Sequence, residues 1–266
     1  MNDSDSAQPL GLETTMVGWA QEAAAVCISH FRRNEGLTFK AGKEAVTAAD
    51  LQIEELLRRR IAAAFPGDTI IGEELAPHQG TSGRTWQVDP IDGTLNFALG
   101  LPDFCTSLAV MEGPDVLAAC VYQPLLKDAF TATRGHGARL NGKPVRVGAR
   151  APLGDAVVSF QCKKKGRLVR KPDRLQALFL ETMKTRKAGA IALELAWVSC
   201  GAYDALIGSF GSAIQLYDVA AGILLVEEAG GRVTDHAGRP FREGAQDLVA
   251  SNGLVHDELT GLYARF

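Results

Sequence analysis

The chain has 266 residues, and its 28 lysines and arginines against 31 aspartates and glutamates give a formal net charge of −3. This balance argues against a protein that binds nucleic acid through bulk positive charge. Hydrophobic residues make up 46% and charged residues 22%, which are the proportions of a globular protein, so we do not expect extensive disorder.

At this length the chain can bury a large core, and we expect one compact unit with two lobes. The longest stretches without a charged residue, such as 205–217, are shorter than the roughly 18 apolar residues that a membrane-spanning helix requires. Residues 1–10 are acidic and polar, without the basic leader or apolar run of a secretory signal, so we expect a cytoplasmic protein. The five cysteines include no Cys-x-x-Cys pair and are expected to be free thiols, with Cys120 buried in an apolar run.

Two helices are predicted at the start of the chain, over residues 13–31 and 48–65. Short β-prone runs at 69–72 and 85–88 follow, and each ends in acidic residues. Three strand-like segments between residues 104 and 133 then predict an antiparallel meander, because turn residues separate them. After the meander, Asn141-Gly142 predicts a hairpin turn, since tight turns of this kind require positive φ.

The second half of the chain alternates strands with helices. The expected strands are 156–160, 186–188, 204–207 and 232–234, and the expected helices are 173–183, 191–199 and 218–229. This order implies sheets covered by layers of helices. The basic run 163–171 is expected to be a solvated loop rather than a patch that steers phosphate. We divide the chain into an N-terminal α+β lobe, residues 1–148, and a C-terminal α/β lobe, residues 149–266, that completes the site.

The chemistry concentrates in residues 86–97, WQVDPIDGTLNF. Asp89 and Asp92 leave a predicted strand and enter what reads as a helix start, so both carboxylates can point at one place. Two carboxylates at so short a separation repel each other unless a cation lies between them or one of them is protonated. Magnesium prefers oxygen ligands of this kind. The backbone N–H groups of Gly93 and Thr94 would suit a phosphate oxygen. The segment therefore predicts a site where metal and phosphate meet.

Three other acidic motifs could join this site, and each also has a structural explanation. Glu73 and Glu74 could form an exposed turn. Asp218 could be the N-cap of a late helix, where aspartate is favoured. Asp50 lies in a Thr-x-x-Asp pattern that is typical of a capping box.

The co-occurrence of these motifs is more specific than any one of them. In this order the chain carries VTxxD, GEE, DPIDGTxNF and a late DVAAG followed by EAGG. On these residues, over about 22–231, it resembles the inositol monophosphatase family of magnesium-dependent, lithium-sensitive phosphatases. The resemblance implies a layered αβαβα sandwich, an α+β fold shared with fructose-1,6-bisphosphatases, and assembly as a homodimer.

The resemblance also implies the metal ligands. Glu73, Asp89 and the backbone carbonyl of Ile91 would hold a first magnesium ion, and Asp89, Asp92 and Asp218 a second. Some members bind a third, weaker ion. Paired ions of this kind can clamp both ends of an in-line displacement, one lowering the pKa of the attacking water and the other stabilising the leaving alkoxide.

The remaining roles that the resemblance implies concern phosphate, water and the leaving alcohol. Gly93 and Thr94 would contact the phosphate, Thr94 with Glu73 would orient the water, and Asp50 would lie behind the metal ligands. The expected contacts to the rest of the substrate come from Asp92, Gly189, Ala190 and Asp218.

The substrate-selecting wall departs from the family. Inositol-selective members carry a glutamate seven residues before the late aspartate, where this chain has Gly211, or Gly208 once a short insertion is allowed for. A pocket without this acceptor should select less strongly for a polyol. The Gly189-Ala190 pair lacks the hydroxyl that many members have there, and Tyr217 in place of tryptophan is predicted to change packing only.

These observations favour a magnesium-dependent phosphatase of small phosphate monoesters, with inositol monophosphate as the default substrate. Histidinol phosphate, fructose bisphosphate and nucleotide 3′-phosphates stay open, although Leu95-Asn96 argues against the nucleotide class. The rival hypothesis is a non-catalytic protein that uses this fold to bind RNA polymerase or another partner. The complete acidic set weighs against a loss of activity.

Overall fold

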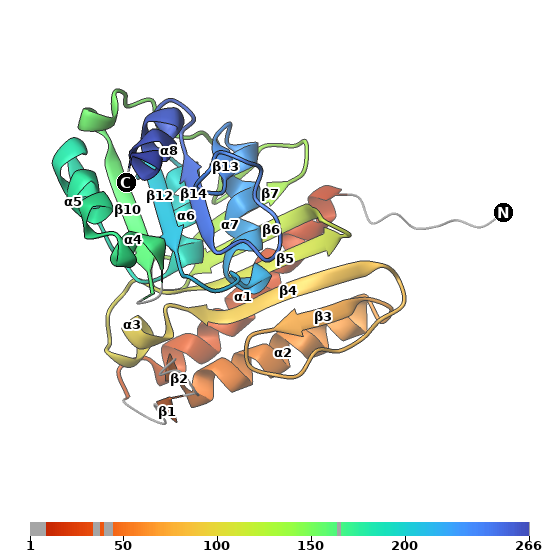
Figure 1. The fold of residues 1–266 in the computed structure, drawn as a ribbon. Coiled ribbons are helices and arrows are strands. Elements are labelled where there is room, and N and C mark those ends of the chain that lie inside the picture. Colours follow the sequence, from red (N-terminus) through yellow and green to blue (C-terminus); the bar gives the residue numbers. More distant parts are fainter. Residues whose placement is uncertain (1–8, 34–37, 40–44, 164–165, 266) are drawn as a thin grey trace.

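The computed structural model describes residues 9–33, 38–39, 45–163 and 166–265 as stacked layers of helices and sheets (Figure 1). The helices are α1 (Pro9–His30), α2 (Ala48–Ala64), α3 (Thr94–Ala98), α4 (Arg167–Arg170), α5 (Pro172–Glu181), α6 (Ile191–Ser199), α7 (Leu216–Glu228) and α8 (His256–Ala264), with a 3-10 turn at Leu153–Asp155. A small antiparallel pair is formed by β1 (Thr38–Phe39) and β2 (Ala45–Val46).

The first large sheet has seven strands in chain order. They are β3 (Thr69–Gly72), β4 (Arg84–Asp92), β5 (Cys105–Glu112), β6 (Asp115–Gln123), β7 (Asp128–Thr133), β8 (Ala138–Leu140) and β9 (Lys143–Val145). Only the β3–β4 pair is parallel, and the rest form the predicted antiparallel meander. Asn141 and Gly142 join β8 to β9 with φ of 51° and 75°, as the hairpin prediction requires.

The second large sheet has five strands in the order β11-β10-β12-β14-β13. Their bounds are β10 (Val157–Cys162), β11 (Lys184–Arg186), β12 (Ala205–Ser209), β13 (Arg232–Thr234) and β14 (Asp247–Ser251). The central strand β12 runs parallel to β10 and antiparallel to β14. The short strand β14 and the helix α8 are missing from the sequence predictions.

Successive side chains of a strand point to opposite faces, and this alternation builds the layers. On the seven-stranded sheet, Leu108 packs with α1 and α2, whereas its neighbour Ala109 packs with α6 and α7. The other faces of α6 and α7 pack on the five-stranded sheet, whose far side is covered by α4, α5 and α8. The order of layers is therefore αβαβα, which confirms the predicted fold class (Figure 1).

Because α6 and α7 pack on both large sheets, they belong to the core of each. The first sheet lies within residues 69–145 and the second within residues 157–251. The division into lobes at residue 148 stays a prediction.

The basic run 163–171 differs from its prediction as a solvated loop. Part of it forms α4, in which Leu168 is fully buried, because its side chain packs into the core beneath β10. Lys164 and Lys165 lie outside the described residues, as do residues 1–8, which carry most of the segment considered for a leader.

The cysteines agree with the sequence prediction. All five are free thiols, and Cys120 is fully buried. Within the described ranges, no helix combines the length and the apolarity that crossing a membrane requires.

Candidate active site

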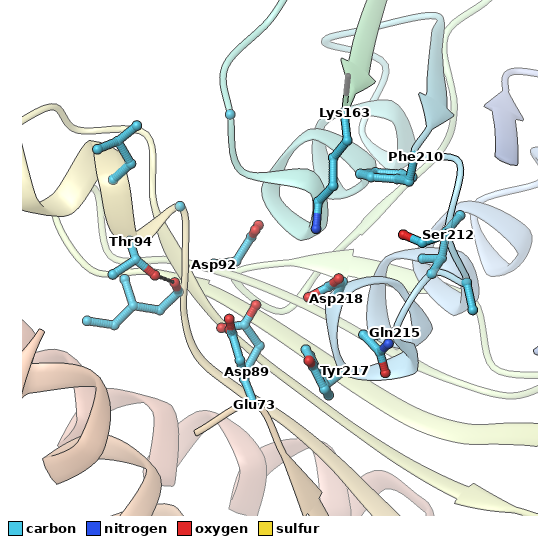
Figure 2. Close-up of a pocket in the computed structure, with 16 residues that line it drawn as sticks. Glu73, Asp89, Asp92, Thr94, Lys163, Phe210, Ser212, Gln215, Tyr217 and Asp218 are labelled. Carbon is cyan, nitrogen blue, oxygen red and sulfur yellow. Dashed lines mark hydrogen bonds between the residues drawn. The ribbon is translucent and has the colours of Figure 1, made fainter. Parts of the chain in front are cut away.

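Three of the predicted metal ligands meet beside the ends of β3 and β4. The two strands are parallel with Gly72 opposite Val88, so Glu73, directly after β3, and Asp89, within β4, lie side by side. Asp218 reaches the same place from the first turn of α7. Carboxylate oxygens of Glu73, Asp89 and Asp218 lie within 4.8 Å of one another, and Figure 2 shows these side chains converging. Such a group is repulsive without a cation.

Asp89 is the most constrained of the three. Burial, followed by the charges of Glu73, Asp92 and Asp218, raises its pKa well above the ordinary value. Its Oδ1 is buried and has no hydrogen-bond partner among the described residues. A buried acceptor in this state is costly, and a hard divalent cation would satisfy it through oxygen coordination. The residues present therefore fit a magnesium ion.

Asp92 lies in the same pocket, but its carboxylate binds the start of helix α6. Its Oδ1 accepts the N–H of Ile191 at 3.0 Å, and its Oδ2 accepts those of Ala192 and Leu193 at 2.7 and 3.2 Å. The carboxylate thus caps the N-terminus of α6. Burial raises the pKa of Asp92 to about 7, although these three hydrogen bonds act in the opposite direction. Asp92 lies outside the three-carboxylate group, and its role as a metal ligand stays a prediction.

Asp50 forms the capping box that its sequence pattern predicts, and it also contacts Thr94. With Thr47 it forms the capping box at the start of α2, and its Oδ2 accepts the Thr47 N–H at 2.8 Å. Its Oδ1 lies 3.2 Å from the hydroxyl of Thr94, which also lies 2.9 Å from the carbonyl of Ile91. Burial raises the pKa of Asp50, and the hydrogen bonds from Thr47 and Thr94 oppose that shift.

Gly93 is required where β4 turns into α3. Its φ is 89°, and a Cβ there would lie 2.8 Å from the carbonyl oxygen of Asp103 and 3.0 Å from the methyl group of Ala190. The loop before α6 therefore packs directly on the DPIDGT turn. Gly189 lines the pocket, whereas Ala190 is fully buried behind it.

Two buried glutamates that the sequence analysis missed hold the walls of the pocket. On α2, Glu54 accepts the N–H groups of Glu74 and Leu75, at 2.7 and 3.1 Å, and so fixes the turn that carries Glu73. On α6, Glu194 accepts the N–H of Gly189 at 3.0 Å and that of Ala188. Both side chains are fully buried. In the sequence, each of them could have been found as a charged residue on an otherwise apolar helix face.

The far wall of the pocket differs from the sequence prediction. The cavity has a volume of about 640 Å³. Lys163 lines it, although it was expected in a solvated loop, and so does Tyr217, which was expected to change packing only. Gly208 is buried within β12, and a Cβ there would lie 2.9 Å from Cε2 of Phe210. The Phe210 ring thus fills the space beside Gly208, and the wall from Phe210 through residues 212–215 carries no acidic side chain.

Solved structures of metal-dependent phosphatases share this layered fold. One is the structure of an inositol monophosphatase/NADP phosphatase complexed with Mg²⁺ and phosphate. It matches this chain with a TM-score of 0.83 and 26% identity, covering 96% of this chain and 95% of that one. The fold and site therefore define a member of this class of phosphatases.

The family follows from the sequence match. Residues 11–265 match the model of the inositol monophosphatase family, and the chain belongs to that family. It is 34% identical over 233 residues to the fructose-1,6-bisphosphatase/inositol-1-monophosphatase of Thermotoga maritima, covering 86% of this chain and 87% of the relative. The structure of the extragenic suppressor protein SuhB from Bartonella henselae matches with a TM-score of 0.89 and 30% identity, covering 94% and 97%.

Proposed function

We propose that the protein is a magnesium-dependent phosphomonoesterase that hydrolyses a small phosphorylated metabolite by in-line attack of water. Inositol monophosphate is the default substrate, because the family takes its name from it. The observation that carries the proposal is the group formed by Glu73, Asp89 and Asp218, in which the buried Oδ1 of Asp89 has no partner among the described residues. Such a group suits a cation and gives an uncharged ligand no advantage.

The proposed metal ligands are those that the family pattern implies. Glu73, Asp89 and the carbonyl of Ile91 would hold one Mg²⁺, and Asp89, Asp92 and Asp218 a second, with room for a third left open. When bound, magnesium neutralises charge on the phosphoryl oxygens and lowers the pKa of a coordinated water. Phosphoryl transfer needs little else from the protein than positioning and charge stabilisation.

Thr94 is the proposed positioning group for the water. Its single hydroxyl proton can be donated to Asp50 or to the carbonyl of Ile91, which leaves the oxygen lone pairs available to accept a hydrogen bond from water. Glu73 would supply the second acceptor. The N–H groups of Gly93 and Thr94 would face the phosphate, and the close packing of Gly93 on Ala190 keeps this turn in place.

We also propose that the protein works in the cytoplasm as a homodimer and is inhibited by lithium. Five free cysteines suit a reducing compartment. The dimer and the lithium sensitivity rest on the family resemblance.

The direct test is phosphate release from inositol 1-phosphate, histidinol phosphate, fructose 1,6-bisphosphate and adenosine 3′,5′-bisphosphate. Each is measured with and without magnesium, and with lithium added. Magnesium-dependent, lithium-inhibited release from one of them is the expected result. Absence of release from all four would favour the hypothesis of a non-catalytic interaction protein. The Bartonella relative is named as a suppressor protein and not as a phosphatase, which is why this alternative is retained.

A further inference from the structure

One wall of the pocket carries a positive charge beside an aromatic ring. Lys163 follows β10, Phe210 follows β12, and the Lys163 Nζ lies 6.0 Å from the centre of the Phe210 ring. Figure 2 shows the Lys163 side chain extending into the pocket toward the side where Asp92 and Asp218 lie. Of the described residues that line this pocket, Lys163 is the only lysine or arginine.

The backbone fixes the place from which this lysine extends. The parallel pairing of β10 with β12 sets Cys162 opposite Ser209. Directly after it, the N–H of Lys163 donates to the carbonyl of Ser209 at 3.1 Å. Phe210 is held beside Gly208, where any Cβ would come within 2.9 Å of the ring. The lysine and the ring therefore leave neighbouring strands of one sheet together.

The positive and negative side chains of the pocket come from different walls. The carboxylates of Glu73, Asp89 and Asp218 gather on one side, which is the side proposed for metal and the reacting phosphate. The wall next to Lys163 consists of Phe210 and the uncharged residues 212–215. A cavity of about 640 Å³ is within the size range of small-molecule sites, so it has room for a substrate that extends from the phosphate to this wall.

We propose that Lys163 is a specificity-determining residue that selects phosphate monoesters carrying a second anionic group, with the carbon skeleton lying against Phe210. A lysine ammonium is a compact point charge that binds phosphate or carboxylate without demanding a fixed geometry. This inference rests on the proposed phosphomonoesterase function and names the substrate class of the same site.

The test compares substrates that share a skeleton and differ in the second anionic group. One pair is fructose 1,6-bisphosphate and fructose 1-phosphate, and the other is adenosine 3′,5′-bisphosphate and adenosine 3′-phosphate. In at least one pair the wild-type protein should show a kcat/KM about tenfold higher for the bisphosphate, as one charge contact can supply. Lys163→Met should bring this ratio to about two or less by raising KM, because the second anionic group is bound but does not react.

Matched variants separate this role from a general effect of charge. Lys171 is exposed in the same basic run and does not line the pocket, so Lys171→Met should leave the ratio unchanged. Lys163→Arg keeps the positive charge and should keep the preference. The preference should also shrink as the ionic strength rises, since the contact is partly exposed to solvent.

Several results would overturn the inference. An equal loss for both members of each pair in Lys163→Met would place this lysine at the reacting phosphate. A bisphosphate preference that survives Lys163→Met, or a wild-type protein with no such preference, would also refute it. Hydrolysis of inositol 1-phosphate without release from these four substrates would overturn the inference and leave the proposed function standing. No magnesium-dependent release from any of the five would refute both.

Discussion

Replacing Glu54 by glutamine should loosen the turn that carries Glu73, although Glu54 does not line the pocket. The Glu54 carboxylate is fully buried on α2. It accepts the N–H groups of Glu74 and Leu75, and it accepts the Nε–H of Arg58 at 2.8 Å. Arg58 in turn donates to the carbonyls of Leu75 and Ala76, at 2.9 and 3.0 Å. The pair therefore ties the whole turn to the helix.

The magnitude follows from the donors that the variant would leave unpaired. Glutamine keeps the shape but offers one oxygen where Glu54 offers two, so at least one half-buried backbone N–H loses its acceptor. The Arg58 side chain, 14% exposed, also loses its counter-charge. Breaking a buried charge pair costs about 3–5 kcal/mol, and we expect about 3 kcal/mol because one acceptor remains. A displacement of Glu73 by about 1 Å should lower kcat by about a hundredfold.

Urea unfolding of the metal-free protein and kcat at saturating magnesium measure the two effects. Glu55→Gln is the matched control, because Glu55 is the next residue on the same helix and is exposed. It should change the free energy of unfolding by less than about 0.5 kcal/mol and leave kcat unaltered. If Glu54→Gln behaves like this control in both assays, the buried carboxylate does not hold the turn and the reasoning is wrong.

Three further predictions concern the site and the core. Asp89→Asn should abolish turnover and raise the urea midpoint of the metal-free protein, because a carboxyl whose pKa is raised by folding costs stability at every pH above its unfolded pKa. A metal-free variant no more stable than wild type would contradict this. Thr94→Ala should lower kcat more than it raises KM, and an effect confined to KM would rule out the water-orienting role. Burial lowers the pKa of His256 to about 4, so the stability that this residue contributes is present above its unfolded pKa of 6.5 and is lost as pH falls toward 4. This loss amounts to about 3 kcal/mol. His256→Gln should therefore make the free energy of unfolding, measured in urea, depend less on pH between pH 7 and 4.5. An unchanged pH dependence would refute the role of His256.

The sequence predicts the residues of the metal site better than the contacts that hold them. Asp89 and Glu73 follow β-prone runs in the sequence, and the parallel pairing of β3 with β4, which the sequence did not predict, brings them together. The contacts of Asp92 with the start of α6 join residues about a hundred positions apart, so no local pattern reveals them. The same holds for Glu54 and the turn at Glu74, which are twenty positions apart.

Strand register explains why the role of Lys163 could not be predicted. As part of a basic run it has the composition of a solvated loop, and much of that run is indeed exposed. Its position is decided by the pairing of β10 with β12, which carries the chain past Cys162 and into the pocket. Leu168, a few residues later, turns instead into the core. Composition describes the average exposure of the run, whereas the pairing of the strands determines where each side chain of the run lies.

Asp89 and Asp92 show how equal chemistry in the sequence acquires different roles in the fold. Both are aspartates of one motif, and both are nearly fully buried. Asp92 receives three backbone N–H groups from α6, which compensate its charge and join this helix to the end of β4. Asp89 has a buried oxygen with no such donor among the described residues. Because a buried charge is tolerated only with compensation, we expect Asp89 to depend on a bound cation more strongly than Asp92, which already has a helix terminus.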